Sequence, residues 1–571
     1  MKGMGRARWA GPLAAAAATA IVAVPAGGQV QPAGRALESA APERPDPERT
    51  PLPRSGIPPS PVVTPPDGSA FVLSAVRIEG ATLFEEEALA PLWSDLVGVE
   101  ISPAEAGRVA QAVETFFRDE GYVFTRVLPT AIDPASGRVT LRVIEARITS
   151  VTLEEPGGDI GPVRTLLERM ARPLEGLENP TLADLERVLL LLNDIPGILR
   201  ATAVPRRGEG GPGAVALVIN AERDALGGAL FADDRQTPAF GPGVIGALGE
   251  WRSWSSGADT TRLTYTNSFG DALGQEFWTD LGLRRIVQVE HERHLGADGT
   301  RLGGRALYSA SAPEEELARL DLEGEETELE VWLEHPVLRT RPVSVWLRAS
   351  FSARDSQLST PGRTITDDSL RRVFLGARAL TRDATGYVLA NVEISQGLDV
   401  LNASDPDDTR LSRSDGDPQA TILTGGLERE QLLGGTFSLF VRTEGQWASD
   451  PLTAGEEFEL GGATFGRGYD PSEVLGDHGY GAALELRKTD AVEIGPYGVE
   501  TVAYGFLDYG RVLNTGIGVP DADELVSVGI GLRARPTPNS LLGVELAQPM
   551  EALRRDGERK ARLFLSAQIQ F

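Results

Sequence analysis

The chain contains no cysteine, which excludes disulfides, thiol nucleophiles, iron–sulfur clusters and thiolate zinc sites. Lysine is almost absent, and no lysine follows the glycines of a phosphate-binding loop, so a P-loop nucleotide site is excluded. Two of the four histidines, His291 and His294, are three residues apart, whereas a helical zinc motif needs a spacing of four. After residue 30 no run of about 18 apolar residues occurs, which argues against a helical membrane protein.

The charge balance is strongly acidic. The 82 acidic residues outnumber the 55 basic ones, giving a formal net charge of −27, whereas nucleic-acid-binding proteins need a basic face. The sequence has neither the Gly-x-Ser-x-Gly elbow of a lipase-type nucleophile nor a spaced acidic calcium loop. We therefore predict that the protein is not an enzyme, has no catalytic residue, binds no metal or cofactor, and does not bind nucleic acid.

The first residues have the three parts of a secretory signal peptide. Lys2, Arg6 and Arg8 give a positive start, the run 9–24 is almost entirely apolar, and small residues typical of a cleavage site follow. This pattern predicts a signal peptide at 1–26, with an uncleaved N-terminal anchor as the alternative. Residues 27–70 contain eleven prolines and almost no apolar periodicity, which predicts an extended, semi-rigid linker.

Residues 71–146 have the pattern of a small module with the order strand, helix, strand, strand. Strands are expected at 72–78, 122–128 and 138–144. The helix between them begins at Ser102-Pro103-Ala104-Glu105, which has the form of a capping box with proline at the first helical position, and it ends at Gly121.

Residues 147–223 repeat this organisation with one more helix. We expect strands at 147–153, 199–204 and 214–221, a helix at 163–171, and a second helix from Thr181. The second helix carries a leucine stripe, which indicates packing on a sheet, with contact to a partner helix as the alternative. The edge strands of both modules could accept an extended chain by β-augmentation, which is typical of a protein that handles unfolded polypeptides.

From residue 224 to 571 apolar and polar residues alternate with a period of two. The alternation is clear at 343–351, 526–534 and 563–571. A soluble sandwich also alternates. A transmembrane β-barrel is favoured by charged residues within the strands, by acidic loops such as 402–417, and by Phe571 at the last outward position. The length accommodates about 16 antiparallel strands.

Two motifs lie between and within these strands. Phe465-Gly466-Arg467-Gly468-Tyr469-Asp470-Pro471 separates two strand patterns, and Tyr504-Gly505-Phe506-Leu507-Asp508-Tyr509-Gly510 follows. They resemble the loop-6 tip and the Phe-x-Asp-x-Gly wall motif of the outer-membrane assembly-factor superfamily. With the two modules, Leu189–Gly197, Asp233-Asp234-Arg235 and Phe571, residues 70–571 resemble the outer-membrane transporter of two-partner secretion, the haemolysin activator and filamentous haemagglutinin exporter family.

The resemblance implies an architecture and a set of site residues. The fold would be two α+β POTRA domains at 71–146 and 147–223, followed by an all-β transmembrane barrel at 224–571. In this family loop 6 folds into the lumen and its tip arginine meets the wall aspartate. The residues implied are the loop-6 tip Gly466, Arg467, Gly468 and Tyr469, the wall partners Phe506, Asp508 and Gly510, and the assembly signal Phe571.

An anchor of this kind is also reasonable physically. A guanidinium and a carboxylate form directional, charge-assisted hydrogen bonds in a partly shielded lumen, and the glycines beside Arg467 allow the loop to approach the wall. The alternative is that Gly-Arg-Gly-Tyr forms a solvated turn and that Asp508 is an ordinary lumen carboxylate. The family also implies a pore-plugging N-terminal helix, for which only the short stretch 35–40 is available.

The function implied by the resemblance is export. The POTRA domains, in the periplasm, would recognise an unfolded partner exoprotein, which would then cross the bacterial outer membrane through the barrel without ATP. The expected partners are this exoprotein cargo, outer-membrane lipid, and the barrel-assembly machinery through the C-terminal strand. An alternative is a factor that assembles or inserts other barrels, although its relatives usually carry three to five POTRA domains. A passive porin or an outer-membrane enzyme would leave the two modules unexplained.

Overall fold

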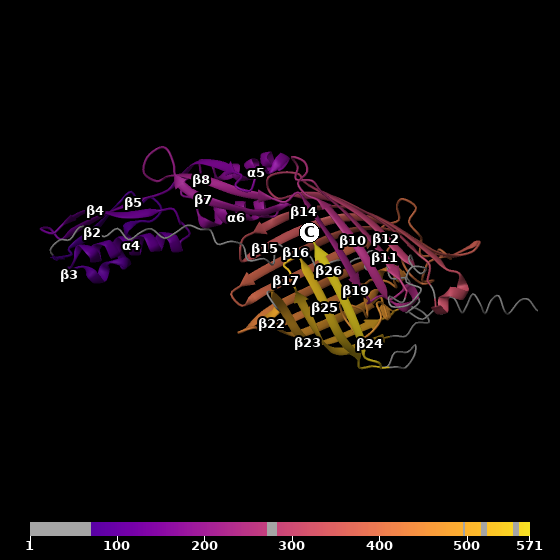
Figure 1. Cartoon of the computed structure of the whole chain (residues 1–571). Helices are drawn as coiled ribbons and strands as arrows, with labels where there is room; N and C mark the ends of the chain where they lie inside the picture. Colours follow the sequence, from indigo (N-terminus) through magenta and orange to yellow (C-terminus); the bar gives the residue numbers. More distant parts are fainter. Residues whose placement is uncertain (1–69, 271–282, 314, 495–496, 516–521, 552–558) are drawn as a thin grey trace, which may run out of the picture.

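The structure is a computed structural model that describes residues 70–270, 283–313, 315–494, 497–515, 522–551 and 559–571. The predicted signal peptide, all but the last residue of the predicted linker, and the short stretch at 35–40 lie outside these residues. Figure 1 shows two small α/β modules in a row, joined to one end of a barrel. None of the described helices is long and apolar enough to span a membrane.

The first module packs α4 (Pro103–Asp119) against a three-stranded sheet. The sheet order is β2 (Ala75–Glu79), β5 (Arg138–Ile144) and β4 (Arg126–Asp133), with β2 parallel and β4 antiparallel to the central strand. The predicted capping box is present, because Ser102 and Glu105 each accept a hydrogen bond from the other's backbone N–H. Shorter elements complete the module: β1 (Phe71–Val72), α3 (Glu86–Leu89), η2 (Ala90–Leu92), η3 (Ser94–Leu96) and β3 (Glu100–Ile101).

The strand predicted at 122–128 is displaced in the structure, where β4 begins only at Arg126. Val123 and Phe124, which lie just upstream of β4, are buried among the apolar side chains of the second module. Intermodule packing therefore draws this segment out of the sheet, and a single module's periodicity could not indicate it. The shared core also indicates that the two modules are packed together rather than freely jointed.

The second module places α5 (Arg164–Ala171) and α6 (Leu182–Asn193) on a sheet ordered β6 (Arg147–Glu154), β8 (Ala214–Arg223), β7 (Ile198–Arg207). As in the first module, the central strand has one parallel and one antiparallel neighbour. The leucine stripe of α6 packs into the module core, as expected for a helix lying on a sheet. Two short helices flank α5: η4 (Gly161–Val163) and η5 (Arg172–Leu174).

Within the described residues, sixteen antiparallel strands form one closed barrel, which confirms the predicted fold class and strand number. The ring closes where the last strand pairs with the first, in register from Ser566 with Asp233 to Gln570 with Ala229. The strands in chain order are β9 (Leu226–Asp233), β10 (Gly243–Trp251), β11 (Thr260–Phe269), β12 (Arg284–His294), β13 (Arg301–Ser311), β14 (Glu323–Arg339), β15 (Val343–Thr360), β16 (Arg363–Asp383), β17 (Gly386–Gly397), β18 (Thr421–Gly434), β19 (Phe437–Ala448), β22 (His478–Ile494), β23 (Tyr497–Leu513), β24 (Ala522–Arg535), β25 (Ser540–Pro549) and β26 (Arg562–Gln570).

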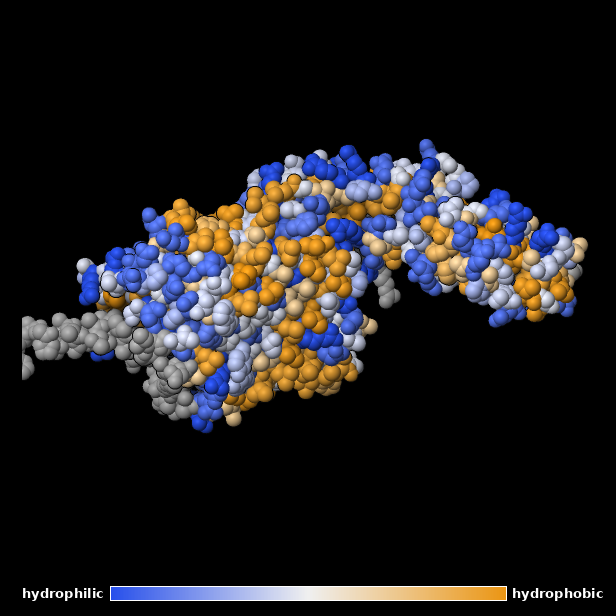
Figure 2. Space-filling view, turned by 180° about the vertical axis from the view of Figure 1, so that it is seen from behind, coloured by the Kyte–Doolittle hydropathy of each residue, from blue (hydrophilic) through white to orange (hydrophobic). Residues whose placement is uncertain are grey.

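The period-two pattern separates the two faces of the barrel wall. In β14, Leu329, Val331 and Leu333 are exposed on the outside, while Glu328 and Glu330 alternate with them on the other face. Figure 2 shows hydrophobic side chains gathered over the outer surface of the barrel. An apolar exterior around a charged interior is the arrangement that a barrel needs in a lipid bilayer.

The second module is fastened to the barrel rim by ion pairs from α6 and the residue after it. Asp194 pairs with Arg339 at the end of β14, with Arg339 Nε 2.7 Å from the carboxylate. Glu186 lies 2.9 Å from Arg341 in the following turn. Arg339 is buried and Asp194 is only partly exposed, so this joint is more than a solvated surface contact. Figure 1 shows that the two modules lead away from the barrel end that carries this joint.

Candidate functional site

Loop 6, residues 449–477, enters the barrel from the end opposite to the modules. It connects β19 to β22 and contains η8 (Ala454–Glu456) and a small hairpin of β20 (Phe458–Leu460) and β21 (Val474–Gly476). Its apolar side chains pack on the inner faces of β22, β23 and β24. The buried cluster comprises Phe458, Leu460, Phe465, Tyr469, Ala483, Val512 and Leu525.

The turn at the loop tip depends on glycine. Gly466 has a φ of +81°, a left-handed conformation that glycine adopts without steric cost, and its carbonyl oxygen accepts a 2.9 Å hydrogen bond from Tyr469 N–H. A Cβ at Gly468 would lie 2.7 Å from the backbone nitrogen of Pro549, at the end of β25. A Cβ at Gly510 would lie 2.4 Å from a methyl carbon of Leu460. These glycines let the loop approach the wall closely.

The structure brings the tip arginine and the wall aspartate together. Arg467 Nε and Nη2 donate to Asp508 Oδ2 and Oδ1 at 3.0 and 2.7 Å, and the Arg467 backbone N–H donates to Oδ2 at 3.0 Å. Ser527 Oγ, on the neighbouring strand, donates to the same carboxylate at 3.1 Å. Asp508 is completely buried and Arg467 is 4% exposed. The contact is therefore a bidentate, fully satisfied ion pair.

The wall motif presents its three residues on one face. Phe506, Asp508 and Gly510 are two residues apart on β23, so all three face the lumen. The Arg467 guanidinium carbon lies 3.6 Å from the centroid of the Phe506 ring, which is a cation–π contact. Phe506 and Asp508 thus contact Arg467 directly, and Gly510 makes room for the loop.

Two further carboxylates, which the sequence did not single out, complete the tip site. Arg467 Nη1 donates to Glu485 on β22 and lies 3.5 Å from Glu545 on β25. Glu485 also accepts from Arg487 and Arg533, and both glutamates are buried. The register places Glu485 directly opposite Phe506. The alternation of apolar and polar residues in β22 could have placed Glu485 on the lumen side. Its position opposite Phe506 depends on the strand register, which cannot be obtained from the sequence alone.

The two remaining predicted residues also have defined contacts. The Tyr469 hydroxyl accepts a 3.0 Å hydrogen bond from the Glu551 backbone N–H and lies 3.1 Å from the carbonyl oxygen of Val526. Phe571 exchanges backbone hydrogen bonds of 2.8 and 3.0 Å with Gly228, next to the closing strand pair, and its side chain is 72% exposed. Tyr469 therefore belongs to the tip site, whereas Phe571 lies apart from it on the outside of the barrel.

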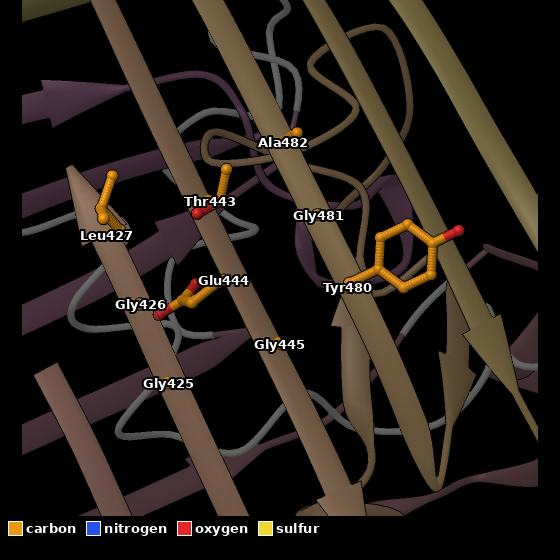
Figure 3. Close-up of a pocket in the computed structure, with 9 residues that line it drawn as sticks. All are labelled: Gly425, Gly426, Leu427, Thr443, Glu444, Gly445, Tyr480, Gly481 and Ala482. Atoms are coloured by element: carbon orange, nitrogen blue, oxygen red, sulfur yellow. The ribbon is translucent and has the colours of Figure 1, made fainter. Parts of the chain in front are cut away.

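A pocket of about 470 Å³ lies in the wall where β18, β19 and β22 run side by side (Figure 3). Its lining is mostly small: Gly425, Gly426, Leu427, Thr443, Glu444, Gly445, Tyr480, Gly481 and Ala482. The Tyr480 ring extends across the neighbouring strand, 6.1 Å from the ring of Tyr509. The pocket is a gap between glycines and contains none of the predicted site residues.

Nothing in the described residues resembles a metal centre, since no group of three or more histidine, aspartate or glutamate side chains could hold an ion there. His291 and His294, both on β12, lie on opposite sides of the wall, as their spacing predicts: the first is largely exposed and the second is buried. The tip site holds the loop to the wall through charged, hydrogen-bonded groups.

A closed barrel with an inward loop held at its wall, joined to two sheet-and-helix modules, defines an outer-membrane POTRA–barrel protein. Residues 306–534 match the family described as haemolysin secretion/activation protein ShlB/FhaC/HecB, and residues 71–146 match the ShlB-type POTRA domain. These two matches confirm the resemblance to this family that was drawn from the sequence. The barrel lies in the outer membrane and the POTRA domains lie in the periplasm.

Individual relatives agree with this assignment. The heme/hemopexin transporter protein HuxB of Haemophilus influenzae is 22% identical over 507 residues, covering 85% of this chain and 84% of HuxB. Among solved structures, CdiB from Escherichia coli has a TM-score of 0.68 at 16% identity and covers 94% of this chain and 95% of its own. BamA from Haemophilus ducreyi lacking POTRA domains 1–3 has a TM-score of 0.53 at 13% identity, covering 88% and 100%. These structural likenesses establish the fold.

Proposed function

We propose that this protein is the transporter of a two-partner secretion system. Its POTRA domains recognise an unfolded partner exoprotein in the periplasm, and the exoprotein then leaves through the barrel without ATP. The observation that carries the proposal is loop 6, a long segment held inside the lumen by hydrogen bonds, ion pairs and a small apolar cluster. Such an obstruction can leave the lumen while the loop stays connected to β19 and β22, because the contacts that hold its tip at the wall are non-covalent.

The chemistry of the lumen suits a passing polypeptide. Arginines and glutamates of neighbouring strands are paired along the wall, for example Arg305 with Glu328 at 2.7 Å and Arg442 with Glu428 at 2.8 Å. A charged, hydrated wall offers an extended chain little apolar surface to adhere to. Since both signs of charge are interleaved, cargo of either net charge is not strongly retained.

The two modules provide main-chain recognition. In each sheet the central strand is flanked by two edges, β2 and β4 in the first module and β6 and β7 in the second. An edge strand can add an extended peptide by β-augmentation, which reads backbone rather than sequence and so suits an unfolded client. Each of these sheets belongs to a separate unit of the fold. We therefore propose that the chain is divided into POTRA domains at 71–146 and 147–223 and a barrel at 224–571.

The energy for export comes from the cargo in this scheme. The periplasm supplies no nucleotide, so the chain is proposed to move outward because it folds beyond the pore and cannot slide back. The HuxB relative, named as a heme/hemopexin transporter, supports a transport role for this architecture. Phe571, exposed at the end of the last strand, is proposed to serve the barrel-assembly machinery when the protein is inserted among outer-membrane lipids.

The test is deletion and complementation in the native bacterium. We expect loss of the protein to leave one large exoprotein, encoded in the neighbouring gene, trapped or degraded in the periplasm, while other barrels remain at normal levels. The alternative, a barrel-assembly factor, predicts the reverse: the deletion depletes many unrelated barrels from the outer membrane, while secretion of the exoprotein continues. That second outcome would contradict the proposal.

A further inference from the structure

The neck of loop 6 contains a second buried carboxylate, distant in sequence from the tip. Asp477 is the last residue of the loop before β22 and is completely buried. It accepts hydrogen bonds from Arg413 at 2.6 and 3.2 Å, from Leu452 N–H at 2.8 Å, and from the backbone and hydroxyl of Thr515 at 2.8 and 2.9 Å. These donors come from loop 5 (residues 398–420, between β17 and β18), from the start of loop 6, and from the segment after β23.

Asp477 therefore joins three extracellular loops. Leu452 lies near the start of loop 6, so its bond to Asp477 closes the neck of that loop. Loop 5, residues 398–420, lies beside the neck and makes two more contacts with it: Asp417 N–H donates to the Pro451 carbonyl oxygen at 2.7 Å, and Ala454 N–H donates to Ser412 Oγ at 3.0 Å.

A pair of consecutive glutamates in loop 6 extends this arrangement. Glu457 accepts from Arg413 at 2.8 Å, so Arg413 holds two carboxylates of loop 6. Glu456 accepts from Arg372 on β16 at 2.7 Å. All four side chains are buried. The neck is thus tied to loop 5 and to β16, whereas the tip is tied to β22, β23 and β25, well away from β16 in the ring.

We propose that Asp477 and Arg413 form a neck latch, a second positioning site that holds loops 5 and 6 together and keeps the extracellular end of the barrel closed. This inference rests on the proposed function, because export requires these loops to part. Buried charges suit a latch that must open, since their desolvation offsets much of their mutual attraction and they regain hydration on separation. An apolar contact of the same area would have no such compensation, because its separation exposes apolar surface to water.

Conductance of the full-length protein in planar lipid bilayers tests the latch without cargo. We expect Arg413→Gln and Asp477→Asn to raise the open probability at least about tenfold, because removing one partner of a buried ion pair is strongly destabilising. The open probability of Arg413→Lys should lie between those of the wild type and Arg413→Gln, since an ammonium group keeps the charge but cannot reproduce the forked geometry of the guanidinium. The matched control is Arg410→Gln on the same loop, whose side chain is exposed and pairs at the surface with Asp367. Wild-type gating in correctly folded Arg413→Gln would overturn the proposal.

A cross-link tests the same idea from the opposite direction. The chain has no native cysteine, and Ser412 Oγ lies 3.0 Å from the Ala454 nitrogen, so Ser412→Cys with Ala454→Cys puts two thiols on adjacent segments of loops 5 and 6, where an oxidant or a short thiol cross-linker can join them. The oxidised pair should stop export and suppress openings, and reduction should restore both. Export at the same rate with the disulfide closed would refute the latch. If the protein exports nothing, the proposed function fails, yet the bilayer result still decides the latch.

Discussion

Arg467 and Asp508 meet through two side-chain hydrogen bonds of 3.0 and 2.7 Å, and a third bond from the arginine's own backbone holds the same carboxylate. The guanidinium also lies on the Phe506 ring. Because the backbone and the side chain of one residue are both committed, the loop tip is fixed in position and direction. The pair closes a buried network that includes Glu485 and Glu545, so its loss leaves uncompensated negative charge against the wall.

We predict that Arg467→Ala impairs secretion while the barrel remains in the outer membrane. The substitution leaves Asp508 buried without its cation, which costs the docked loop about 3–5 kcal/mol. The measurement compares exoprotein in the medium with the heat-modifiable barrel band in the membrane fraction. The control is Arg511→Ala, an exposed arginine on β23, the strand that carries Asp508. Secretion and pore conductance at the wild-type level would show that the tip pair is dispensable.

We predict that Gly468→Ala reproduces part of the Arg467→Ala defect without changing any charge. A Cβ there would press on the backbone of β25, 2.7 Å from the Pro549 nitrogen, and backbone cannot move aside cheaply. The tip would have to move away from β25, at a cost of about 1–3 kcal/mol for an overpacked site. Gly498→Ala is the control, because nothing lies within 4 Å of an added Cβ there. Equal secretion by the two variants would argue against close docking.

Pore closure should depend on pH through Glu457. Burial raises the pKa of Glu457 to about 7, despite the adjacent Arg413, whereas a solvated glutamate in an opened loop returns to 4.5. The closed form therefore binds the proton more tightly. The stabilisation that this proton gives to the closed form is complete below about pH 4.5 and is lost as the pH rises through about 7. We expect more frequent openings at pH 8 than at pH 6 in lipid bilayers.

The charged neighbours do not change this expectation. Burial opposes ionisation of Asp477, but hydrogen bonds from Arg413 and from backbone N–H groups hold its pKa below the ordinary value, so it stays ionised throughout this range. Asp415, 3.2 Å from Arg413, adds a further negative charge nearby, which also disfavours ionisation of Glu457. In Glu457→Gln the frequency of openings should no longer change between pH 6 and pH 8. If the change persists in that variant, another group causes the pH dependence.

We predict that Asp194→Ala loosens the joint between the second POTRA domain and the barrel. Arg339 is buried and would lose its carboxylate partner, at a cost of about 2 kcal/mol once the partial exposure of Asp194 is considered. Pulsed electron paramagnetic resonance between spin labels on α6 and on the barrel rim should give a broader distance distribution. Glu175→Ala, at an exposed position of the same domain, is the control. An unchanged distribution would mean that other contacts hold the joint.

Much of the architecture follows from local patterns. The capping box at Ser102 starts α4 where predicted, because its hydrogen bonds involve residues three positions apart. The Phe-x-Asp-x-Gly spacing places Phe506, Asp508 and Gly510 on one face for the same reason, since side chains on a strand alternate. The displaced strand β4 marks the limit, because Val123 and Phe124 respond to a neighbouring module rather than to their own sequence.

Local sequence sets most of the helices and strands, the apolar face of each strand, and the glycines that permit a tight loop. These properties are set by neighbours along the chain. The contacts of Arg467 with Glu485 and Glu545 arise from the tertiary fold, as does the contact of Arg413 with Asp477, which lies 64 residues further along the chain. Such contacts depend on strand register and on the closure of the ring, which bring distant loops to the same rim and are not encoded in any local period.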